Sequence, residues 1–288
     1  MKIATRSEGC FFLFDGALLH GTPQQVWLLE QPWTVRLYDD LGEQAKLVGP
    51  LLLPASVDKG ELAQALATSD SPRRFACSRL TCSQSPDVLE KHLRDLRHLL
   101  AGEAQRYYFR YADGRALSAV WSTLTPEQQL AAMGPISLWE YIDHGGELTA
   151  LTPPAIAPDQ DVARLPLRLE PAQWHQVLEA GRIGELFEST EQLLSPDVET
   201  HTLAQRHEWT RQTWHWLRSL NIEPGPLYAA ANLAVWQAAG KIKGDPAFEA
   251  ALLEVQNGGD MARILAFGET GVREQSKGKL GVRGEERP

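Results

Sequence analysis

Hydrophobic and polar positions follow different patterns in the two halves of the chain. The first half places short apolar runs between helical patterns, an arrangement that builds a sheet with covering helices. The predicted strands are Cys10–Phe14, Gln25–Leu29, Thr34–Tyr38, Leu47–Leu53, Arg74–Leu80, Tyr107–Tyr111 and Ile136–Ile142. Residues 1–151 are therefore predicted to form an α/β lobe, in which helices cover a mixed sheet.

Two helix starts are marked within this lobe. Ser85-Pro86 offers an N-cap followed by proline at the first helical position, and leucines then recur at helical spacing from Leu89 to Leu100. Thr125-Pro126-Glu127-Gln128 has the form of a capping box, in which the Thr and Gln side chains satisfy each other's backbone donors. We expect one helix to follow each signal.

The second half begins after a proline-rich stretch. Residues 152–169 contain four prolines, which disfavour helix interiors and central strands, and we interpret them as an interdomain linker. Residues 170–267 are helical throughout and predict an all-α lobe, with helices at Pro171–Ala180, Ile183–Leu194, Asp197–Leu220, Leu227–Ala239 and Ala247–Val255. Residues 268–288 alternate glycine with charged residues, which predicts a disordered tail.

Composition narrows the class of protein. The 288 residues are 43% hydrophobic and 23% charged, as in ordinary soluble proteins able to bury a core. A formal charge of -9 without a basic patch argues against nucleic acid as a partner. No stretch has the apolar length of a membrane span, and the odd set Cys10, Cys77 and Cys82 fits a reducing compartment. We expect a cytoplasmic protein without a membrane partner.

Searches for catalytic motifs find little. Ser56-Val57-Asp58-Lys59 matches S-x-x-K, but the accompanying motifs of that enzyme class are missing and Ser56 suits a helix N-cap better. His201, His207 and His215 are spaced six and eight apart, which does not bring two imidazoles to one metal on a helix. We therefore expect no enzyme activity, no metal and no cofactor, while an enzyme with an unfamiliar active site remains an alternative.

Tryptophan is the unusual residue type. Nine of the 288 residues are Trp, and Trp209, Trp214 and Trp216 lie within eight positions of one predicted helix. At 3.6 residues per turn they cannot share one face, so the helix is either central in its bundle or keeps one side for a partner. We favour a core position for all three, with Trp174 and Trp236 packing in the same cluster, and leave partner binding open.

A second candidate region follows the last aromatic strand of the α/β half. Tyr107, Phe109 and Tyr111 share one face by the period of two. Asp113 is placed to cap the following helix, and Arg115 can pair with it or with a nearby carboxylate. These roles account for the residues structurally, and a partner-facing role for Asp113 and Arg115 is the competing hypothesis.

These motifs together resemble a known family. The stretch Phe109–Leu117, then Leu124-Thr125-Pro126-Glu127-Gln128-Gln129, then Gly134-Pro135-Ile136 with Trp139, is similar to the hallmark of the domain-of-unknown-function 4123 (DUF4123) family. Upstream, Leu13–Ala17 and Val48–Leu52 resemble the family's opening strand and its central Gly-Pro-apolar strand. Gly114 stands where the family usually has proline. The resemblance covers roughly the first half of the chain.

The resemblance implies an adaptor, or effector-loading chaperone, of bacterial type VI secretion. Such proteins bind a toxic effector in the cytoplasm and promote its loading onto the spike protein, the valine-glycine repeat protein. The expected partners are thus an effector and a spike protein, and the candidate partner-binding residues are Asp113, Arg115, Trp209, Trp214 and Trp216. The alternatives are a hydrolase-like enzyme and an intracellular scaffold unrelated to secretion.

Overall fold

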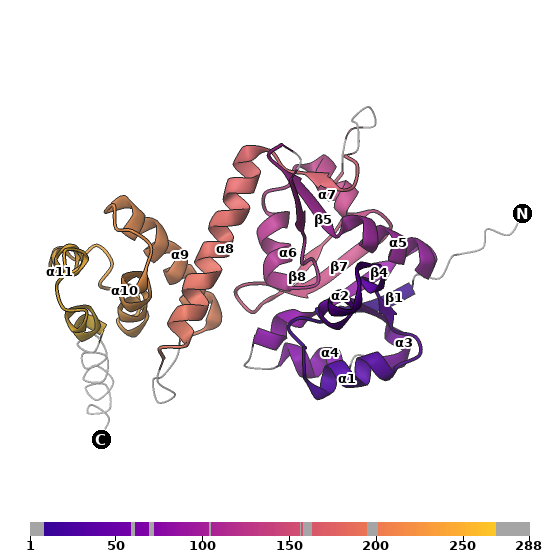
Figure 1. Cartoon of the computed structure of the whole chain (residues 1–288), viewed down its shortest axis with the longest axis horizontal. Helices are drawn as coiled ribbons and strands as arrows, with labels where there is room; N and C mark the ends of the chain where they lie inside the picture. Colours follow the sequence, from indigo (N-terminus) through magenta and orange to yellow (C-terminus); the bar gives the residue numbers. More distant parts are fainter. Residues whose placement is uncertain are drawn as a thin grey trace, which may run out of the picture. The chain divides into compact units, whose positions relative to one another are not determined.

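A computed structural model describes residues 9–58, 61–68, 72–103, 105–155, 157, 163–194 and 201–268 (Figure 1). Their contacts divide the chain into two units, Met1–Glu179 and Ala180–Pro288. The first unit mixes strands and helices and the second is helical, which confirms the predicted fold class. The predicted tail at 268–288 falls outside the described residues except for Gly268.

The strands of the first unit form two sheets. Six described strands lie in the order β2-β3-β1-β4-β7-β8, with every neighbouring pair antiparallel, and three more lie in the order β6-β5-β9. The strand bounds are β1 Gly9–Phe14, β2 Val35–Arg36, β3 Leu51–Pro54, β4 Cys77–Cys82, β5 His98–Ala101, β6 Gln105–Tyr108, β7 Ile136–Ile142, β8 Leu148–Leu151 and β9 Leu167–Arg168.

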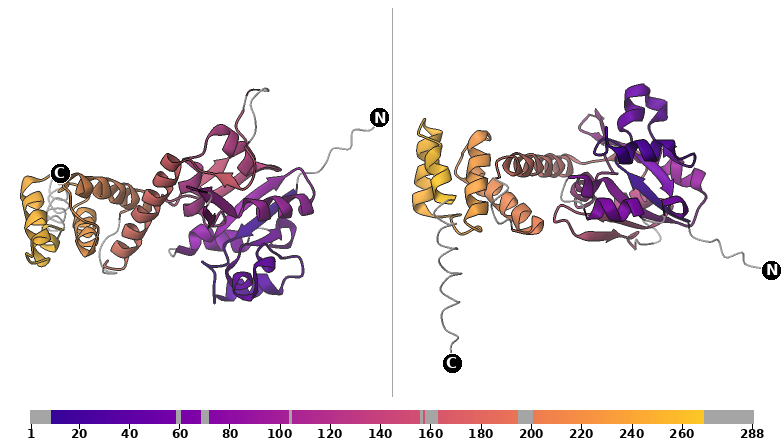
Figure 2. Two further views of the ribbon diagram at one scale, coloured as in Figure 1. Left: turned by 45° about the horizontal axis from the view of Figure 1, so that its top comes forward. Right: turned by 90° about the horizontal axis from the view of Figure 1, so that it is seen from below.

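Helices cover both faces of the larger sheet (Figure 2). Their bounds are α1 Pro23–Glu30, η1 Asp39–Leu41, α2 Glu43–Val48, α3 Ala55–Asp58, α4 Glu61–Ala67, η2 Pro72–Ala76, α5 Pro86–Leu96, α6 Gly114–Trp121 and α7 Pro126–Met133. Along β1, Phe11 and Leu13 face the core beneath α5, α6 and α7, whereas Phe12 and Phe14 face the core beneath α1 and α4. This two-sided burial explains why β1 is an uninterrupted apolar run.

Several predicted strands differ from the observed elements. Gln25–Leu29 lies within the helix α1, whose start is capped by the Thr22 hydroxyl accepting the Gln25 backbone N–H at 3.2 Å. Thr22-Pro23 is the same cap-plus-proline signal that marks other helices here, and it outweighs the short apolar run that predicted a strand. The predicted strand Tyr107–Tyr111 is shifted to β6, and β5 was not predicted because Leu100 continued the spacing of the α5 leucines.

The proline-rich stretch 152–169 belongs to the first unit. In it, β9 pairs in parallel with β5, and Leu167 and Leu169 are buried. Pro166 stands just before this two-residue edge strand, a position where a missing N–H is tolerated. The contacts instead divide the chain between Glu179 and Ala180, inside the helix α8.

The second unit is a helical bundle. The helix α8 spans Pro171–Glu191, and its part from Ala180 onward belongs to this unit. The other helices of the bundle are α9 Leu203–Ser219, α10 Pro226–Gln237 and α11 Pro246–Gln256. The two helices predicted at 171–180 and 183–194 are one continuous helix. Inside the bundle, the amide of Asn232 on α10 donates to the hydroxyls of Thr190 on α8 (2.9 Å) and Thr210 on α9 (3.0 Å). Buried hydrogen bonds of this kind fix the positions of the three helices relative to one another.

Candidate functional site

Four charged side chains of the first unit meet where β1 ends and α6 begins. Asp15 follows β1 directly, and Asp113 caps α6 by accepting the backbone N–H of Arg115 at 3.0 Å. Nη2 of Arg110 donates to both carboxylate oxygens of Asp15 at 3.1 Å and lies 3.4 Å from Oδ2 of Asp113. Arg110 therefore joins two carboxylates, one of which is 95 residues away from it in sequence and the other three residues away.

Arg115 completes this charged cluster. Its Nη2 donates to Oδ2 of Asp113 at 2.9 Å, and its guanidinium carbon lies 5.0 Å from the centre of the Phe75 ring, within the range of cation–π attraction. Gly114 lies between the two charged residues. A Cβ there would be 2.2 Å from the carbonyl oxygen of Ile142, so this backbone path does not accommodate the proline that is usual at this position in the resembled family.

Burial dominates the electrostatics of Asp15. Desolvation raises the pKa of its carboxyl above the usual value, although Arg110 and the backbone N–H of Leu18 lower it by favouring the charged form. Asp113 adds a smaller upward contribution to the same pKa as a second negative charge. The two carboxylates thus depend on the neighbouring guanidinium groups for compensation.

The structure brings the predicted residues Asp113 and Arg115 together, and both are engaged within the cluster. Asp113 is almost fully buried, and its carboxylate serves the helix cap and two guanidinium groups. Arg110 is the member of the four with the most solvent-exposed side chain. By the period of two, Arg110 lies on the face opposite Phe109 and Tyr111, and this alternation was the available signal for its exposure.

The three predicted tryptophans pack in the second unit. Trp214 is buried, with its ring 5.2 Å from that of Tyr228 in an edge-on arrangement. Nε1 of Trp216 donates to Oε1 of Glu249 at 3.0 Å. Trp209 packs against Gly240, where a Cβ would lie 2.7 Å from the indole nitrogen. All three indoles are therefore held by contacts within this unit.

Two other expectations about tryptophan fare differently. Trp236 is buried in the second unit and donates from Nε1 to the Thr210 hydroxyl at 3.2 Å. Trp174 does not join it, because the first turns of α8 pack on the first unit, where the Trp174 ring lies 4.3 Å from that of Tyr107. The prediction of one shared cluster was wrong for Trp174.

The exposed indoles of the described residues lie elsewhere, in the first unit. Trp33 is 64% exposed and Trp27 is 36% exposed. Neither was predicted as a candidate, because Gln25–Leu29 was predicted as a strand and Trp33 lies between it and the next predicted strand. With the helix start at Thr22-Pro23 recognised, Trp27 falls two positions from Gln25 and one from Leu28, off the face that these two residues bury.

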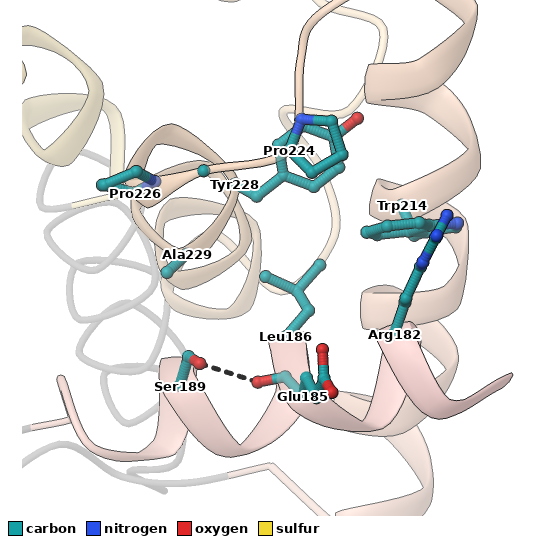
Figure 3. Close-up of a pocket in the computed structure, with 10 residues that line it drawn as sticks. Arg182, Glu185, Leu186, Ser189, Trp214, Pro224, Pro226, Tyr228 and Ala229 are labelled. Atoms are coloured by element: carbon teal, nitrogen blue, oxygen red, sulfur yellow. Dashed lines mark hydrogen bonds between the residues drawn. The ribbon is translucent and has the colours of Figure 1, made fainter. Parts of the chain in front are cut away.

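A pocket opens on the second unit among α8, α9 and the loop before α10 (Figure 3). Its volume is about 530 Å³, within the range of ligand sites. The apolar part of the lining comes from Leu186, Trp214, Tyr228 and Ala229, and the remaining lining residues are Arg182, Glu185, Ser189, Pro224, Gly225 and Pro226. In Figure 3 the Arg182 side chain extends from α8 beside Trp214, which gives this apolar pocket a charged rim.

Among the described residues, no group of three or more His, Cys, Asp or Glu side chains is arranged to hold a metal ion. The described helices also include none whose length and apolarity would suffice to cross a membrane.

One protein family matches part of this chain. Residues 10–131 match the family described as Domain of unknown function (DUF4123). Comparison with curated proteins and with solved structures found no match.

The DUF4123 match supports the resemblance seen in the motifs of the same stretch. It begins within β1, includes the charged cluster and the two exposed indoles, and ends within α7. The packed tryptophans of α9 and the pocket of the second unit lie outside it. The features of the two units therefore differ in family support as well as in structure.

Proposed function

We propose that this protein is an adaptor of type VI secretion, which binds an effector in the cytoplasm and promotes its loading onto the valine-glycine repeat spike protein. The observation that carries the proposal is the DUF4123 match over residues 10–131, in the stretch whose motifs resemble that family. The family's role as an adaptor is what the resemblance implies, and it is extended here to this chain.

Two structural features support an adaptor. The first unit exposes the side chains of Trp27 and Trp33, a residue type enriched at the energetic centres of protein interfaces. The second unit carries a separate pocket whose apolar lining includes Trp214 and Tyr228. An adaptor needs distinct surfaces for an effector and a spike protein, and the chain offers one on each unit.

Co-purification tests the proposal directly. The chain is expressed with an affinity tag alongside the products of the reading frames that flank its gene, with the spike protein and the toxin expressed singly and together. We expect a complex of the adaptor with the toxin, and recruitment of the spike protein when all three are present. Failure to retain either product, with all proteins soluble, would refute the adaptor role.

A variant series assigns the surfaces. Trp209→Ala, Trp214→Ala and Trp216→Ala are compared with Trp27→Ala and Trp33→Ala for both toxin retention and thermal melting. Because the first three indoles are packed, we expect any loss of toxin in those variants to accompany a lower melting temperature. Loss of toxin without loss of stability is expected only for the exposed pair.

A further inference from the structure

Exposed apolar side chains are concentrated on one segment of the first unit. Among the described residues, α1, the turn after it and α2 expose Val26, Trp27, Trp33, Leu47 and Val48. The other large exposed apolar side chains are spread over the rest of the described chain. Single exposed apolar residues are ordinary, whereas a concentration of them marks an interaction site. We call the surface of these five residues the α1–α2 surface.

Hydrogen bonds hold the elements of this surface together. The buried side-chain amide of Gln25 on α1 donates to the carbonyl oxygens of Gly16 (3.2 Å) and Leu47 (2.5 Å), which fixes α1 against the end of α2. The Thr34 hydroxyl donates to the carbonyl of Leu28 at 2.7 Å and ties the turn carrying Trp33 back to α1. The apolar side chains are therefore presented by an ordered scaffold.

The charges beside the α1–α2 surface are arranged with the acids outermost. Arg94 of α5 and Arg97, the residue that follows this helix, bond Asp39 and Asp40, the first two residues of η1, at 2.6–2.8 Å. The side chains of the two aspartates are 51% and 46% exposed, against 20% and 16% for the two arginines. On α2, the Glu43 side chain is 87% exposed and that of its partner Lys46 is 30% exposed.

Glu30, at the end of α1, adds another exposed carboxylate. Although several of these acids are paired, their cationic partners lie deeper. Arg36, which bonds the carbonyl oxygen of Leu29 at 3.4 Å, is the exposed cation among residues 23–48, so a molecule approaching from solvent meets four exposed carboxylates and one exposed guanidinium group. This arrangement complements a partner that carries basic residues.

We propose that the α1–α2 surface docks an amphipathic segment of a partner protein, one whose apolar side chains are flanked by Lys and Arg. This deepens the proposed function by naming the chemistry of one partner, and it rests on that function only for the partner's identity. The apolar side chains of the segment cover Trp33, Trp27 and their neighbours, while its basic side chains face Glu30, Asp39 and Glu43.

Charge decides between this occupant and a second copy of the chain. The protein carries a formal charge of -9, and two copies meeting through this surface would bring the same exposed acids together. Like charges facing each other across an interface disfavour association, whereas a basic segment gains from the same carboxylates.

Two synthetic peptides of about 18 residues test the proposal, each with leucine on one helical face. One has lysine on the opposite face and the other has glutamate, so that the two match in hydrophobicity. Their binding to the full chain is measured by fluorescence anisotropy. We expect the lysine peptide to bind and the glutamate peptide to bind at least about tenfold more weakly.

Matched variants locate the binding. Trp33→Ser with Leu47→Ser removes exposed apolar surface from the α1–α2 surface, and we expect it to weaken the lysine peptide about tenfold or more. Leu148→Ser with Leu253→Ser removes exposed leucines elsewhere and leaves binding unchanged. Glu30→Lys with Glu43→Lys weakens the lysine peptide and strengthens the glutamate peptide. Peptide affinities are compared only among variants whose melting temperature equals that of the wild-type protein.

The outcomes separate this inference from the adaptor role. Equal binding of the lysine peptide to wild type and to Trp33→Ser with Leu47→Ser overturns the docking surface, even if wild type still retains the toxin. If the wild-type protein does not retain the toxin, the adaptor role is refuted. The peptide measurements still decide whether the α1–α2 surface binds a basic amphipathic segment. A wild-type dimer that Trp33→Ser converts to a monomer assigns the surface to a second copy and also overturns the inference.

Discussion

The clustered tryptophans of the second unit and the exposed tryptophans of the first unit have opposite environments. In the second unit, Trp214 and Trp216 lie close together in sequence and are held by Tyr228, Phe248 and Glu249. In the first unit, Trp27 and Trp33 are separated by a helix end and are exposed to solvent. Clustering along the sequence therefore did not mark the accessible indoles here, and isolated indoles are found both buried, as at Trp139 and Trp236, and exposed, as at Trp27 and Trp33. Whether an indole is packed or exposed depends on the helix or turn in which it lies.

The largest expected effect tests the packed side of this comparison. Trp214→Ala removes a buried indole and leaves a cavity beside Tyr228, which should lower the free energy of unfolding by about 3–5 kcal/mol. Chemical denaturation followed by far-ultraviolet circular dichroism measures the change. Trp33→Ala is the matched control and should change stability by less than about 0.5 kcal/mol. Similar losses for both would contradict the contrast.

The caps of α6 and α11 provide a second comparison between the units. Asp113→Ala removes a helix cap and the shared partner of Arg110 and Arg115, so we expect a loss of about 2 kcal/mol. Asp245→Ala in the second unit removes an exposed cap that accepts the Ala247 N–H at 2.7 Å and should cost about 1 kcal/mol. Thermal melting of the two variants, side by side, checks the order. A larger loss for Asp245→Ala would show that the charged cluster adds nothing to its cap.

A single hydrogen bond tests how firmly one packed indole is held. Trp216→Phe removes the donor to Glu249 while keeping an aromatic ring near Phe248, and we expect a loss of about 1 kcal/mol. Glu249→Gln retains an acceptor for the indole and should cost less. Denaturant midpoints distinguish the two. Equal effects would mean that the charge of Glu249, rather than its acceptor oxygen, matters.

The smallest expected effect is in pH dependence. Burial lowers the pKa of His92, whose Nε2 lies 2.8 Å from the carbonyl oxygen of Ala132. The unfolded chain therefore takes up this proton first, and stability contributed in the first unit falls as pH drops below about 6.5. Arg211 lowers the pKa of Glu208 in the second unit to about 2, so that contribution is lost only as pH falls below about 4.3.

Melting temperatures at closely spaced pH values test this order. His92→Gln should flatten the dependence between pH about 6.5 and 5, and Glu208→Gln should leave that interval unchanged. An unaltered profile for His92→Gln would place the proton uptake on another group.

Strong local signals made much of the fold predictable. The strands β1 and β7 and the capping box of α7 are found where the sequence placed them. Where local signals competed, the predicted element was wrong: α1 has a cap-plus-proline start but a short apolar run, and β5 continues the leucine spacing of α5. The sequence predicted a break between Ala180 and Ile183, yet α8 runs through this stretch, where Ile183 and Leu186 are buried in the bundle and tertiary packing outweighs the low helix propensity of glycine.

The candidate site was only partly predictable. The cap at Asp113 follows from residue type and position, and the structure confirms it, because the Asp113 carboxylate accepts the backbone N–H of Arg115. The pairing of Arg110 with Asp15 spans 95 residues and depends on how β1 and the end of β6 are brought together. No local pattern encodes that approach. The exposure of Trp33 likewise depends on the turn between α1 and β2, whose conformation no local pattern predicts.

The contacts of Arg94 and Arg97 have a kinetic consequence. They tie η1 to α5, since Arg94 also donates to the carbonyl oxygens of Arg36 and Leu37, so the acidic residues beside the α1–α2 surface occupy fixed positions before any encounter. Fixed charges of one sign guide an oppositely charged molecule during diffusion, and salt weakens that guidance. The association rate of a basic partner should therefore fall steeply with ionic strength, while its dissociation rate changes little.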